Sequence, residues 1–421
     1  MNKFIFLLLA SLLVTPALAS DWSMFKKDAP HSGFTTDAVN PPLTVAWSSV
    51  LGYDSDSSPV IVNDILYVGS NYGIHALDAK TGRELWRTPT NGFVKSSPVV
   101  ADGVLYVGAD DNRFYAMDII NGSMKWIYKN ATNGYTSSPI VVNNLAYEGS
   151  KGGSFYAFDI QSGEPSWQVS TGKVVESSPA MEDGIIVFGS NGGLVVAIDT
   201  VTRKEKWWYD TGISDIISSP LIAEGSVFVG SNDGNIYALN STNGALKWKY
   251  PTGGNVQSSP SYKDGTIFAG SRDSNLYAID ASTGSLKWKT QTAGFVDSSP
   301  AISNDVVYFG SRNNLIYGLD ANTGKLLWRN STGQNDKDYI TSPAISGNML
   351  FAVTHGGVVY AYSGVAVQAT PATTPTLKET TAMPTPTSSP AVTPTATKKT
   401  PGFEFPIMVL LILVLIRKRH D

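Results

Sequence analysis

The sequence predicts an all-β fold, an eight-bladed β-propeller of four-stranded antiparallel blades. Two periodic features carry this prediction. A Ser/Thr-Ser-Pro triplet occurs eight times between residues 57 and 343, and its prolines follow one another at steps of 39 to 43 residues (Pro59, Pro98, Pro139, Pro179, Pro220, Pro260, Pro300 and Pro343). Eight tryptophans keep the same period (Trp47, Trp86, Trp126, Trp167, Trp207, Trp248, Trp288 and Trp328). A period near 40 in a β-rich sequence is typical of a four-stranded unit repeated around a ring.

Each repeat contains the signals of four short strands and three tight turns. In the copy at 258–294, two apolar runs flank Asp264-Gly265, and Asp-Gly between such runs favours a hairpin because both turn positions need positive φ. A second turn at 272–275 leads into a strand at 276–279. A third turn at 280–284 then leads into the outer strand, so one copy makes one blade.

The two ends of the repeat array are complementary. The first tryptophan strand, at 44–50, has no preceding strands of its own, whereas the last triplet starts three strands that end near Tyr362 without a tryptophan strand. Pairing the N-terminal strand with the last blade completes the eighth blade and leaves no open edge. We therefore expect one monomeric propeller domain over residues 20–364.

The third turn and the outer strand share a pattern, which reads Asp-x-x-Thr-Gly-x-x-x-Trp from Asp280 to Trp288. The Asp carboxylate can accept backbone N–H bonds in the turn, Gly supplies a conformation that a Cβ would resist, and Trp covers the seam to the next blade. We interpret these residues as structural blade-docking residues: Asp78, Trp86, Asp118, Trp126, Asp159, Trp167, Trp207, Trp248, Asp280, Trp288, Asp320 and Trp328.

This pattern resembles the Ala-x-Asp-x-x-Thr-Gly-x-x-x-Trp docking motif of the PQQ-like (quinoprotein-like) repeat family. Two copies match it less well, with Arg203 in place of Gly in one and Asn240 in place of Asp in the other. The lead segment 21–33 also resembles the opening of secreted family members. The resemblance implies the propeller fold. Its superfamily includes the propeller lipoprotein of the bacterial barrel-assembly machine, a scaffold without chemistry, and quinoprotein alcohol dehydrogenases, which hold pyrroloquinoline quinone (PQQ) over the channel.

Composition excludes several classes of function. The 421 residues include no Cys, which rules out disulfides, thiolate metal sites and a Cys nucleophile. The four His are scattered without ligand spacing, so we expect no His-based zinc site. The formal net charge is −4, and residues 20–364 carry 24 basic against 32 acidic side chains without a Lys/Arg cluster. We therefore expect no nucleic-acid partner.

The N-terminal residues indicate export. Lys3 is followed by an apolar run at 4–14 and then by Pro16-Ala17-Leu18-Ala19, a small-x-small cleavage site. These features predict a signal peptide over residues 1–19, cut after Ala19. The alternative is an N-terminal membrane anchor.

The C-terminal residues indicate attachment to the cell surface. Residues 365–400 hold 12 Thr and six Pro, which predicts a disordered stalk of extended, polyproline-like chain. Residues 401–421 combine Pro-Gly-Phe, a short apolar stretch and Arg417-Lys418-Arg419. This order of parts resembles the archaeal PGF-type sorting signal, which implies an archaeosortase that removes the helix and a lipid that replaces it. The alternative is a retained tail anchor, and either one places the body outside the cell.

Four Asn-x-Ser/Thr sequons agree with export. Asn121 and Asn240 occupy repeat positions in turns, whereas Asn130 and Asn330 are expected just past a tryptophan strand. We take Asn130 and Asn330 as the candidate N-glycosylation sites.

Residues that give this protein a specific function are expected where the copies of the repeat differ. The residue before each triplet varies and leads into the innermost strand, so these side chains should gather at one mouth of the central channel: Asp56, Lys95, Thr136, Glu176, Ile217, Gln257, Asp297 and Ile340. We take the charged and amide members as candidate partner-binding residues: Asp56, Lys95, Glu176, Gln257 and Asp297. The alternative is a solvated rim without a partner.

The expected function is a non-enzymatic binding scaffold on the cell surface, which presents a rigid propeller to envelope proteins or glycans. No catalytic, cofactor-binding or metal-binding residues are predicted. The alternative is a dehydrogenase that uses PQQ and Ca²⁺, or another surface enzyme, with its site at the channel mouth. The chain lacks the vicinal Cys pair and the large inserted loops of the quinoprotein dehydrogenases, and no Glu/Asn/Asp group stands out as a Ca²⁺ site.

Overall fold

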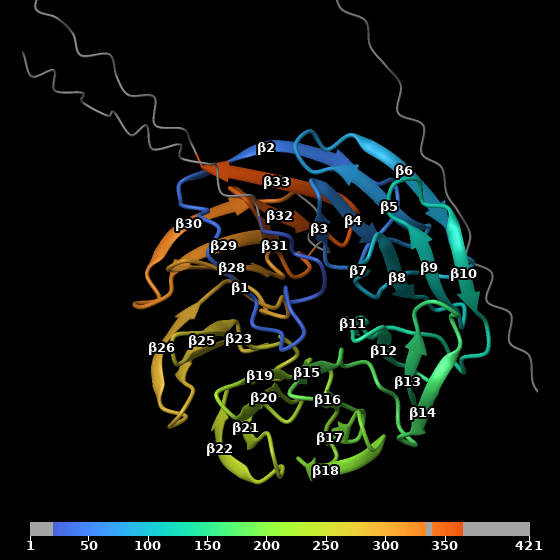
Figure 1. Cartoon of the computed structure of the whole chain (residues 1–421). Helices are drawn as coiled ribbons and strands as arrows, with labels where there is room; N and C mark the ends of the chain where they lie inside the picture. Colours follow the sequence, from blue (N-terminus) through green and yellow to red (C-terminus); the bar gives the residue numbers. More distant parts are fainter. Residues whose placement is uncertain (1–19, 334–338, 365–421) are drawn as a thin grey trace, which may run out of the picture. The chain divides into compact units, whose positions relative to one another are not determined.

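The structure, a computed structural model, describes residues 20–333 and 339–364. These residues form eight antiparallel sheets arranged around a central axis, and no helix occurs among them (Figure 1). The predicted eight-bladed propeller is therefore confirmed. The predicted signal peptide, stalk and sorting segment lie outside the described residues. No helix long and apolar enough to cross a bilayer is found in the described part of the chain.

Blades 1 to 4 each consist of four consecutive strands, from the innermost to the outermost. The strands of blade 1 are β3(Val60–Val62), β4(Ile65–Gly69), β5(Gly73–Asp78) and β6(Glu84–Pro89), and those of blade 2 are β7(Val99–Ala101), β8(Val104–Gly108), β9(Phe114–Asp118) and β10(Met124–Tyr128). The strands of blade 3 are β11(Ile140–Val142), β12(Leu145–Gly149), β13(Ser154–Asp159) and β14(Pro165–Ser170), and those of blade 4 are β15(Ala180–Glu182), β16(Ile185–Gly189), β17(Leu194–Asp199) and β18(Lys204–Asp210).

Blades 5 to 7 repeat this arrangement, and blade 8 takes its outer strand from the N-terminal part of the chain. The strands of blade 5 are β19(Leu221–Ala223), β20(Ser226–Gly230), β21(Asn235–Asn240) and β22(Leu246–Pro251), and those of blade 6 are β23(Ser261–Lys263), β24(Thr266–Gly270), β25(Asn275–Asp280) and β26(Leu286–Gln291). The strands of blade 7 are β27(Ala301–Ser303), β28(Val306–Ser311), β29(Leu315–Asp320) and β30(Leu326–Ser331), and those of blade 8 are β31(Ala344–Ser346), β32(Met349–Val353), β33(Val358–Gly364) and β2(Leu43–Val50).

The ring closes as the sequence predicts. β2 pairs antiparallel with β33, from Leu43 opposite Gly364 to Val50 opposite Val358. Blade 8 is thus built from both ends of the propeller, which leaves no unpaired edge between the first and last blades. A further short strand, β1(Phe34–Thr35), adds in parallel to β27 of blade 7.

The tryptophans lie at the seams between blades. In seven of the eight, the indole N–H donates to a backbone carbonyl of the next blade at 2.9–3.0 Å: Trp47 to Ala79, Trp86 to Ile119, Trp126 to Ile160, Trp207 to Ser241, Trp248 to Ala281, Trp288 to Ala321 and Trp328 to Leu43. These bonds run around the ring and include both seams of blade 8. The exception is Trp167, whose indole nitrogen has no hydrogen-bond partner among the described residues.

The turn that precedes each tryptophan strand is held by its aspartate. The Asp280 carboxylate accepts hydrogen bonds from the backbone N–H of Thr283 at 2.9 Å and from the Thr283 hydroxyl at 2.9 Å. Hydrogen bonds from Ser282 and Thr283 lower the pKa of Asp280. Gly284 has φ +73°, and a Cβ there would lie 2.7 Å from the ring of Trp248 in the preceding blade. Gly is therefore required both by backbone conformation and by the approach of the indole.

The triplets form a belt of serines around the channel. In seven of the eight pairs of neighbouring blades, the backbone N–H of the second serine donates to the hydroxyl of the second serine in the next blade, each at 2.9 Å: Ser58 to Ser97, Ser97 to Ser138, Ser138 to Ser178, Ser178 to Ser219, Ser219 to Ser259, Ser259 to Ser299 and Ser299 to Ser342. The first serine bonds within its own blade and to the next one, as where the Ser177 hydroxyl accepts from Gly189 N–H and donates to the Ser218 carbonyl. The triplet is thus a blade-linking device.

Candidate functional site

The central channel is closed on one side by the N-terminal segment 22–39, which we call the plug. Its backbone bonds to the middle residue of the innermost strand in six blades: Trp22 to Ile61, Ser23 to Val100, Ala29 to Met181, Pro30 to Ile222, Ser32 to Tyr262 and Gly33 to Ile302. The innermost strands run from the serine belt toward these contacts, so the plug lies beyond the belt, on the side away from the residues that precede the triplets. Sequence reasoning predicted no such role for this segment.

Two buried basic side chains anchor the plug. Lys26 Nζ donates to the Pro300 carbonyl at 2.7 Å and also bonds to the Ser261 hydroxyl. Burial lowers the pKa of Lys26 to about 7. His31 Nδ1 lies 2.9 Å from the Pro220 carbonyl, and burial lowers the pKa of His31 to about 3, so the ring is neutral at pH 7 and donates from Nδ1. The plug is therefore fixed by specific side-chain bonds to blades 5, 6 and 7.

On the other side of the belt the channel is an open cup of about 210 Å³. Phe25 of the plug and serines of the belt line it. Of the predicted partner-binding residues, four line this cup: Asp56, Lys95, Gln257 and Asp297. Glu176 is not among the lining residues, and its carboxylate instead accepts from Asn191 Nδ2 at 3.4 Å. The structure thus brings four of the five predicted residues together.

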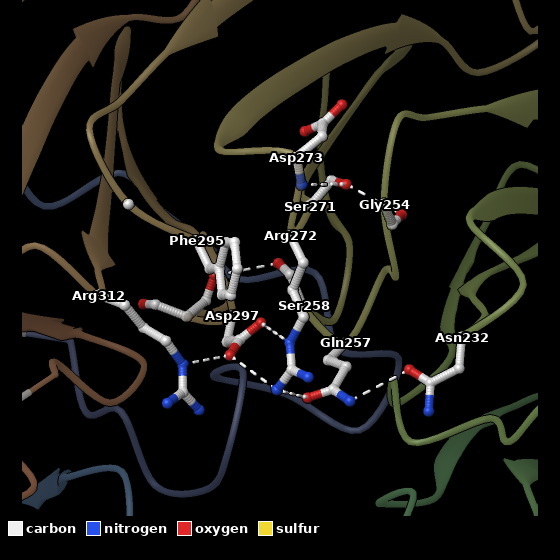
Figure 2. Close-up of polar contacts among 12 residues, drawn as sticks. Asn232, Gly254, Gln257, Ser258, Ser271, Arg272, Asp273, Phe295, Asp297 and Arg312 are labelled. Carbon is white, nitrogen blue, oxygen red and sulfur yellow. Dashed lines mark hydrogen bonds and ion pairs between the residues drawn. The ribbon is translucent and has the colours of Figure 1, made fainter.

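Asp297 is the centre of a charged network at the mouth (Figure 2). Its carboxylate accepts from Arg272 Nε at 3.0 Å and from Arg312 Nε at 2.6 Å. Arg272 Nη2 also donates to Gln257 Oε1 at 2.7 Å, and Gln257 Nε2 donates to Asn232 Oδ1 at 3.1 Å. A chain of four hydrogen-bonded side chains therefore crosses from blade 5 to blade 7, with Arg312 bonded at its end.

The network continues through aromatic rings on the other side of Arg312. The Arg312 guanidinium carbon lies 4.5 Å from the centre of the Tyr339 ring, which stacks on His355 at 4.7 Å. Asp56 accepts from the Tyr339 hydroxyl and lies 2.8 Å from His355 Nδ1. Lys95 Nζ lies 3.9 Å from the other oxygen of Asp56. Cationic and anionic groups therefore alternate along one arc of the mouth.

Sequence reasoning missed Tyr339 because the last copy is irregular. Ile340 precedes its triplet, but the Ile340 side chain is buried against Gly310, as Val296 is buried against Gly270 in the neighbouring blade. Val296 lies two residues before its triplet, whereas Ile340 lies directly before its own, so one residue fewer separates the buried side chain from the triplet in the last copy. Tyr339, the residue before Ile340, then supplies the polar group at the mouth. The other partners, Arg272, Arg312 and His355, all lie in the turn that follows the second strand of their blades.

Exposed apolar side chains surround this mouth. Four of the loops that lead from an outer strand to the next triplet carry an exposed apolar or aromatic side chain, namely Tyr53, Phe93, Ile213 and Phe295, with Ile213 97% exposed. These loops lie at the mouth because their carbonyls receive bonds from mouth turns, as where Arg312 N–H donates to Phe295 O. The mouth therefore combines a charged cup with exposed apolar side chains on neighbouring loops.

The candidate glycosylation residues differ in exposure. Asn130 is exposed in the loop after β10, whereas Asn330 lies half-buried within β30. Asn121 and Asn240 accept backbone N–H bonds in their own turns. The structure therefore presents Asn130 more openly than Asn330.

The residues of the cup do not fit the quinone and calcium of the dehydrogenases. No group of three or more His, Asp or Glu among the described residues is placed to hold a metal ion. The carboxylates of Asp56 and Asp297 are already paired with basic groups. The cup is also smaller than the 300–1,000 Å³ typical of small-molecule sites. We therefore derive no chemical step through a quinone.

Comparison with solved structures shows the same architecture in proteins of different kinds. BamB from Moraxella catarrhalis matches with 19% identity and a TM-score of 0.66, covering 77% of this chain and 99% of that one. The quinohemoprotein alcohol dehydrogenase from Comamonas testosteroni matches with 16% identity and a TM-score of 0.71, covering 82% and 81%. The computationally designed Ika8 protein matches with 20% identity and a TM-score of 0.65, covering 75% and 98%. At these identities the likeness shows the fold alone.

No curated protein matches the chain. The family model described as outer membrane protein assembly factor BamB matches residues 36–174, 151–294 and 251–392 in overlapping segments. These matches cover most of the chain, and they include the docking turns, the tryptophan strands and the triplets of all eight blades. The chain therefore belongs to the outer membrane protein assembly factor BamB family of PQQ-like repeat propellers.

Proposed function

We propose that this chain is a non-enzymatic binding scaffold, which presents the mouth of its propeller to another protein of the cell envelope. The observation that carries the proposal is the charged cup with exposed apolar side chains on four of the loops beside it. Apolar side chains that cluster near polar, directional groups are typical of protein interfaces.

The fixed charges would select the partner, and the apolar rim would supply affinity. Asp297, Arg272 and Arg312 hold one another in place before a partner arrives. A pre-ordered surface loses less side-chain entropy on binding than a surface of free side chains. Charged groups arranged in this way contribute chiefly specificity and association rate.

The proposed location at the cell envelope is supported by the residues at the two ends of the chain and by the family. The predicted signal peptide and the predicted sorting segment support an extracellular body that is tethered to the surface, through its C-terminal segment or a lipid. The family's description names an outer membrane protein assembly factor, which also acts in an envelope. An exposed Asn130 in a sequon agrees with this placement.

A pull-down from intact envelopes tests the proposal. The tagged full-length chain is compared with a variant that carries Phe93→Ser and Phe295→Ser at the mouth, and with Ile120→Ser as a control on an exposed docking turn. We expect the wild type and the control to recover the same protein and the mouth variant to lose it. Recovery of no protein across a range of salt concentrations would contradict the proposal.

A glycan partner is distinguished in the same experiment. If envelopes treated with protease still compete for the chain, and envelopes treated with glycosidase do not, the bound partner is a glycan. That outcome would overturn the choice of a protein partner while leaving the scaffold role intact.

The second candidate is a dehydrogenase that uses PQQ and Ca²⁺. One observation favours it, namely that the cup is closed at its base and open at a single mouth. Titration with PQQ and Ca²⁺, followed by a dye-linked dehydrogenase assay, is the test. Tight binding of one quinone per chain with dye reduction would overturn the scaffold proposal.

A further inference from the structure

A second cavity lies at the seam between blades 3 and 4, and we call it the seam pocket. Its volume is about 320 Å³, and its apolar lining includes Val169 from β14, Phe188 from β16 and Val196 from β17. Glu205, Trp208 and Asp210 from the outer strand β18 also line it. β14 and β18 are neighbouring outer strands in Figure 1, so the pocket lies in the outer part of the ring. It shares no lining residue with the cup.

The seam pocket occupies a place that a ring fills in the other blades. Val196 is the third residue of β17, and the equivalent residue in every other blade is aromatic: His75, Tyr115, Tyr156, Tyr237, Tyr277, Tyr317 and Tyr360. The register is the same, since Val196 lies opposite Trp208 as Tyr237 lies opposite Lys249. Blade 4 therefore lacks the volume of one aromatic side chain at this position.

Blade 4 also lacks the partner of that ring. In three blades the tyrosine hydroxyl donates to an aspartate four residues earlier, as Tyr115 does to Asp111, and this aspartate lies in the second turn. At the matching place in blade 4 the chain has Gly192, which offers no side-chain acceptor. Blade 4 thus has neither the tyrosine ring nor the aspartate that accepts its hydrogen bond. The space that remains is an apolar cavity, and no aspartate is left there without a partner.

The docking contact at the same seam is altered as well. Arg203, at φ 57°, stands where six blades have a glycine that packs on the preceding tryptophan, as Gly163 does with a Cβ position 2.6 Å from Trp126. A side chain there prevents that close approach, and Trp167 is the docking tryptophan without an acceptor for its indole N–H. Three departures from the repeat therefore meet at one seam, beside the cavity.

The outer part of the seam pocket favours a positive charge. Glu205 and Asp210 are both exposed carboxylates, and none of the described residues that line the pocket is basic. Trp208 is 57% exposed between them in β18, and an indole face attracts cations. In the other blades this strand position carries residues such as Arg87, Lys249 and Lys289.

We propose that the seam pocket binds a small aromatic ligand that carries an ammonium group. The ring occupies the space left by the missing tyrosine, against Val169, Phe188 and Val196. The ammonium group lies beside Glu205 and Asp210 and against the face of Trp208. An apolar cavity with a few charged groups at its opening is the usual form of a site for such a molecule.

Calorimetric titration of the full-length chain with tryptamine tests this proposal. Indole-3-propionate has the same ring with the opposite charge, and hexylamine has the charge without a ring. We expect saturable binding of one tryptamine per chain, at least about tenfold tighter than either analogue, since both the ring and the charge contribute. Equal binding of indole-3-propionate, or no saturation with tryptamine, would overturn the proposal.

Variants of the pocket give an independent test. Val196→Tyr restores the ring of the other blades and should abolish binding, whereas Val50→Tyr, on an exposed position of β2, should leave binding unchanged. Glu205→Gln with Asp210→Asn should weaken tryptamine roughly three- to tenfold, because each exposed pair is weak on its own. Glu164→Gln, an exposed acid on the docking turn of blade 3, is the charge control.

The fold of each variant is checked by its thermal transition. If Val196→Tyr does not fold, ¹⁹F spectra of the chain labelled with 5-fluorotryptophan supply the second readout, with Trp208→Phe used to assign its signal. Tryptamine should shift the Trp208 signal in the wild type and leave that of Trp22, in the plug, unchanged. A chain in which Val196→Tyr folds and still binds tryptamine with wild-type affinity would refute the assignment of the site.

Discussion

The unequal seams make a quantitative prediction about two tryptophans. Trp207 and Trp167 are similarly buried, at 6% and 9% exposure, and both pack between blades. Trp207 donates its indole N–H to the Ser241 carbonyl at 2.9 Å, whereas the Trp167 indole N–H has no partner among the described residues. Replacing each with Phe removes a similar apolar surface, but only Trp207→Phe removes a hydrogen bond.

The difference between the two variants estimates that bond. A typical intramolecular hydrogen bond contributes about 1 kcal/mol, and leaving a buried partner unsatisfied costs about 1–3 kcal/mol. The loss of area is nearly common to both variants and largely cancels. We expect Trp207→Phe to lower the free energy of unfolding by about 1–2 kcal/mol more than Trp167→Phe does.

Urea unfolding of the wild type and both variants measures this difference. Equal slopes of free energy against urea would show that the compactness of the end states is unchanged, so that the midpoints report stability. Equal losses in the two variants, or a larger loss in Trp167→Phe, would refute the view that the seam between blades 3 and 4 lacks the docking bond.

Three further predictions concern buried charge and backbone. In the unfolded chain Lys26 stays protonated up to the ordinary lysine pKa of 10.5, whereas in the folded chain its pKa is about 7. Between pH 8 and 10 the folded state therefore binds one proton fewer, so the free energy of unfolding should rise with pH. Urea titrations should show that the wild type gains up to about 1.4 kcal/mol per pH unit relative to Lys26→Met. Burial raises the pKa of Glu148 well above 4.5, so Glu148→Val should become increasingly more stable than the wild type, in the same assay, as the pH rises above about 5. Gly284→Ala places a Cβ against Trp248 and should lower the melting temperature more than Gly225→Ala, which shares positive φ but meets nothing within 4 Å. The first prediction is contradicted if the stability of the wild type relative to Lys26→Met does not change with pH. The second is contradicted if the difference between Glu148→Val and the wild type stays constant, and the third if Gly284→Ala and Gly225→Ala melt at the same temperature.

The blade number and the closure of the ring were predictable because their signals are local. Asp264 and Gly265 have φ of 46° and 70°, the pair of positive values that the Asp-Gly signal requires. Closure followed from a surplus strand at one end and a missing strand at the other. Repetition made these local signals reliable, since a misread copy is corrected by its neighbours.

The plug was not predictable from its residue types. Its bonds to Ile61, Val100 and Ile302 are made by backbone atoms, which every sequence offers. The belt role of the triplets was hidden for a related reason, because Ser58 and Ser97 belong to different copies and meet only once the ring is closed. Such contacts depend on the assembled ring.

The mouth was predicted in part. Asp56, Lys95, Gln257 and Asp297 were placed together because they share one position in the repeat. Tyr339 was missed because one residue fewer separates the buried apolar side chain from the triplet in the last copy, so the residue directly before the triplet, Ile340, is buried. Residues that depart from the repeat therefore indicate where the blades differ in structure. Arg203 is one of them: the sequence shows it in place of a docking glycine, but only the structure shows its effect on the seam.

The most direct test of the scaffold account is photocrosslinking in the intact envelope. A photoreactive amino acid is placed at Lys95, which is exposed at the mouth, or at Asp305, which is exposed in a hairpin turn at the opposite ends of the strands. The account predicts one dominant crosslinked envelope protein from position 95, its loss on Asp297→Asn with Arg312→Gln, and none from position 305. The same crosslinked protein from position 305, or no crosslink from position 95, would contradict the claim that this propeller binds its partner at the mouth.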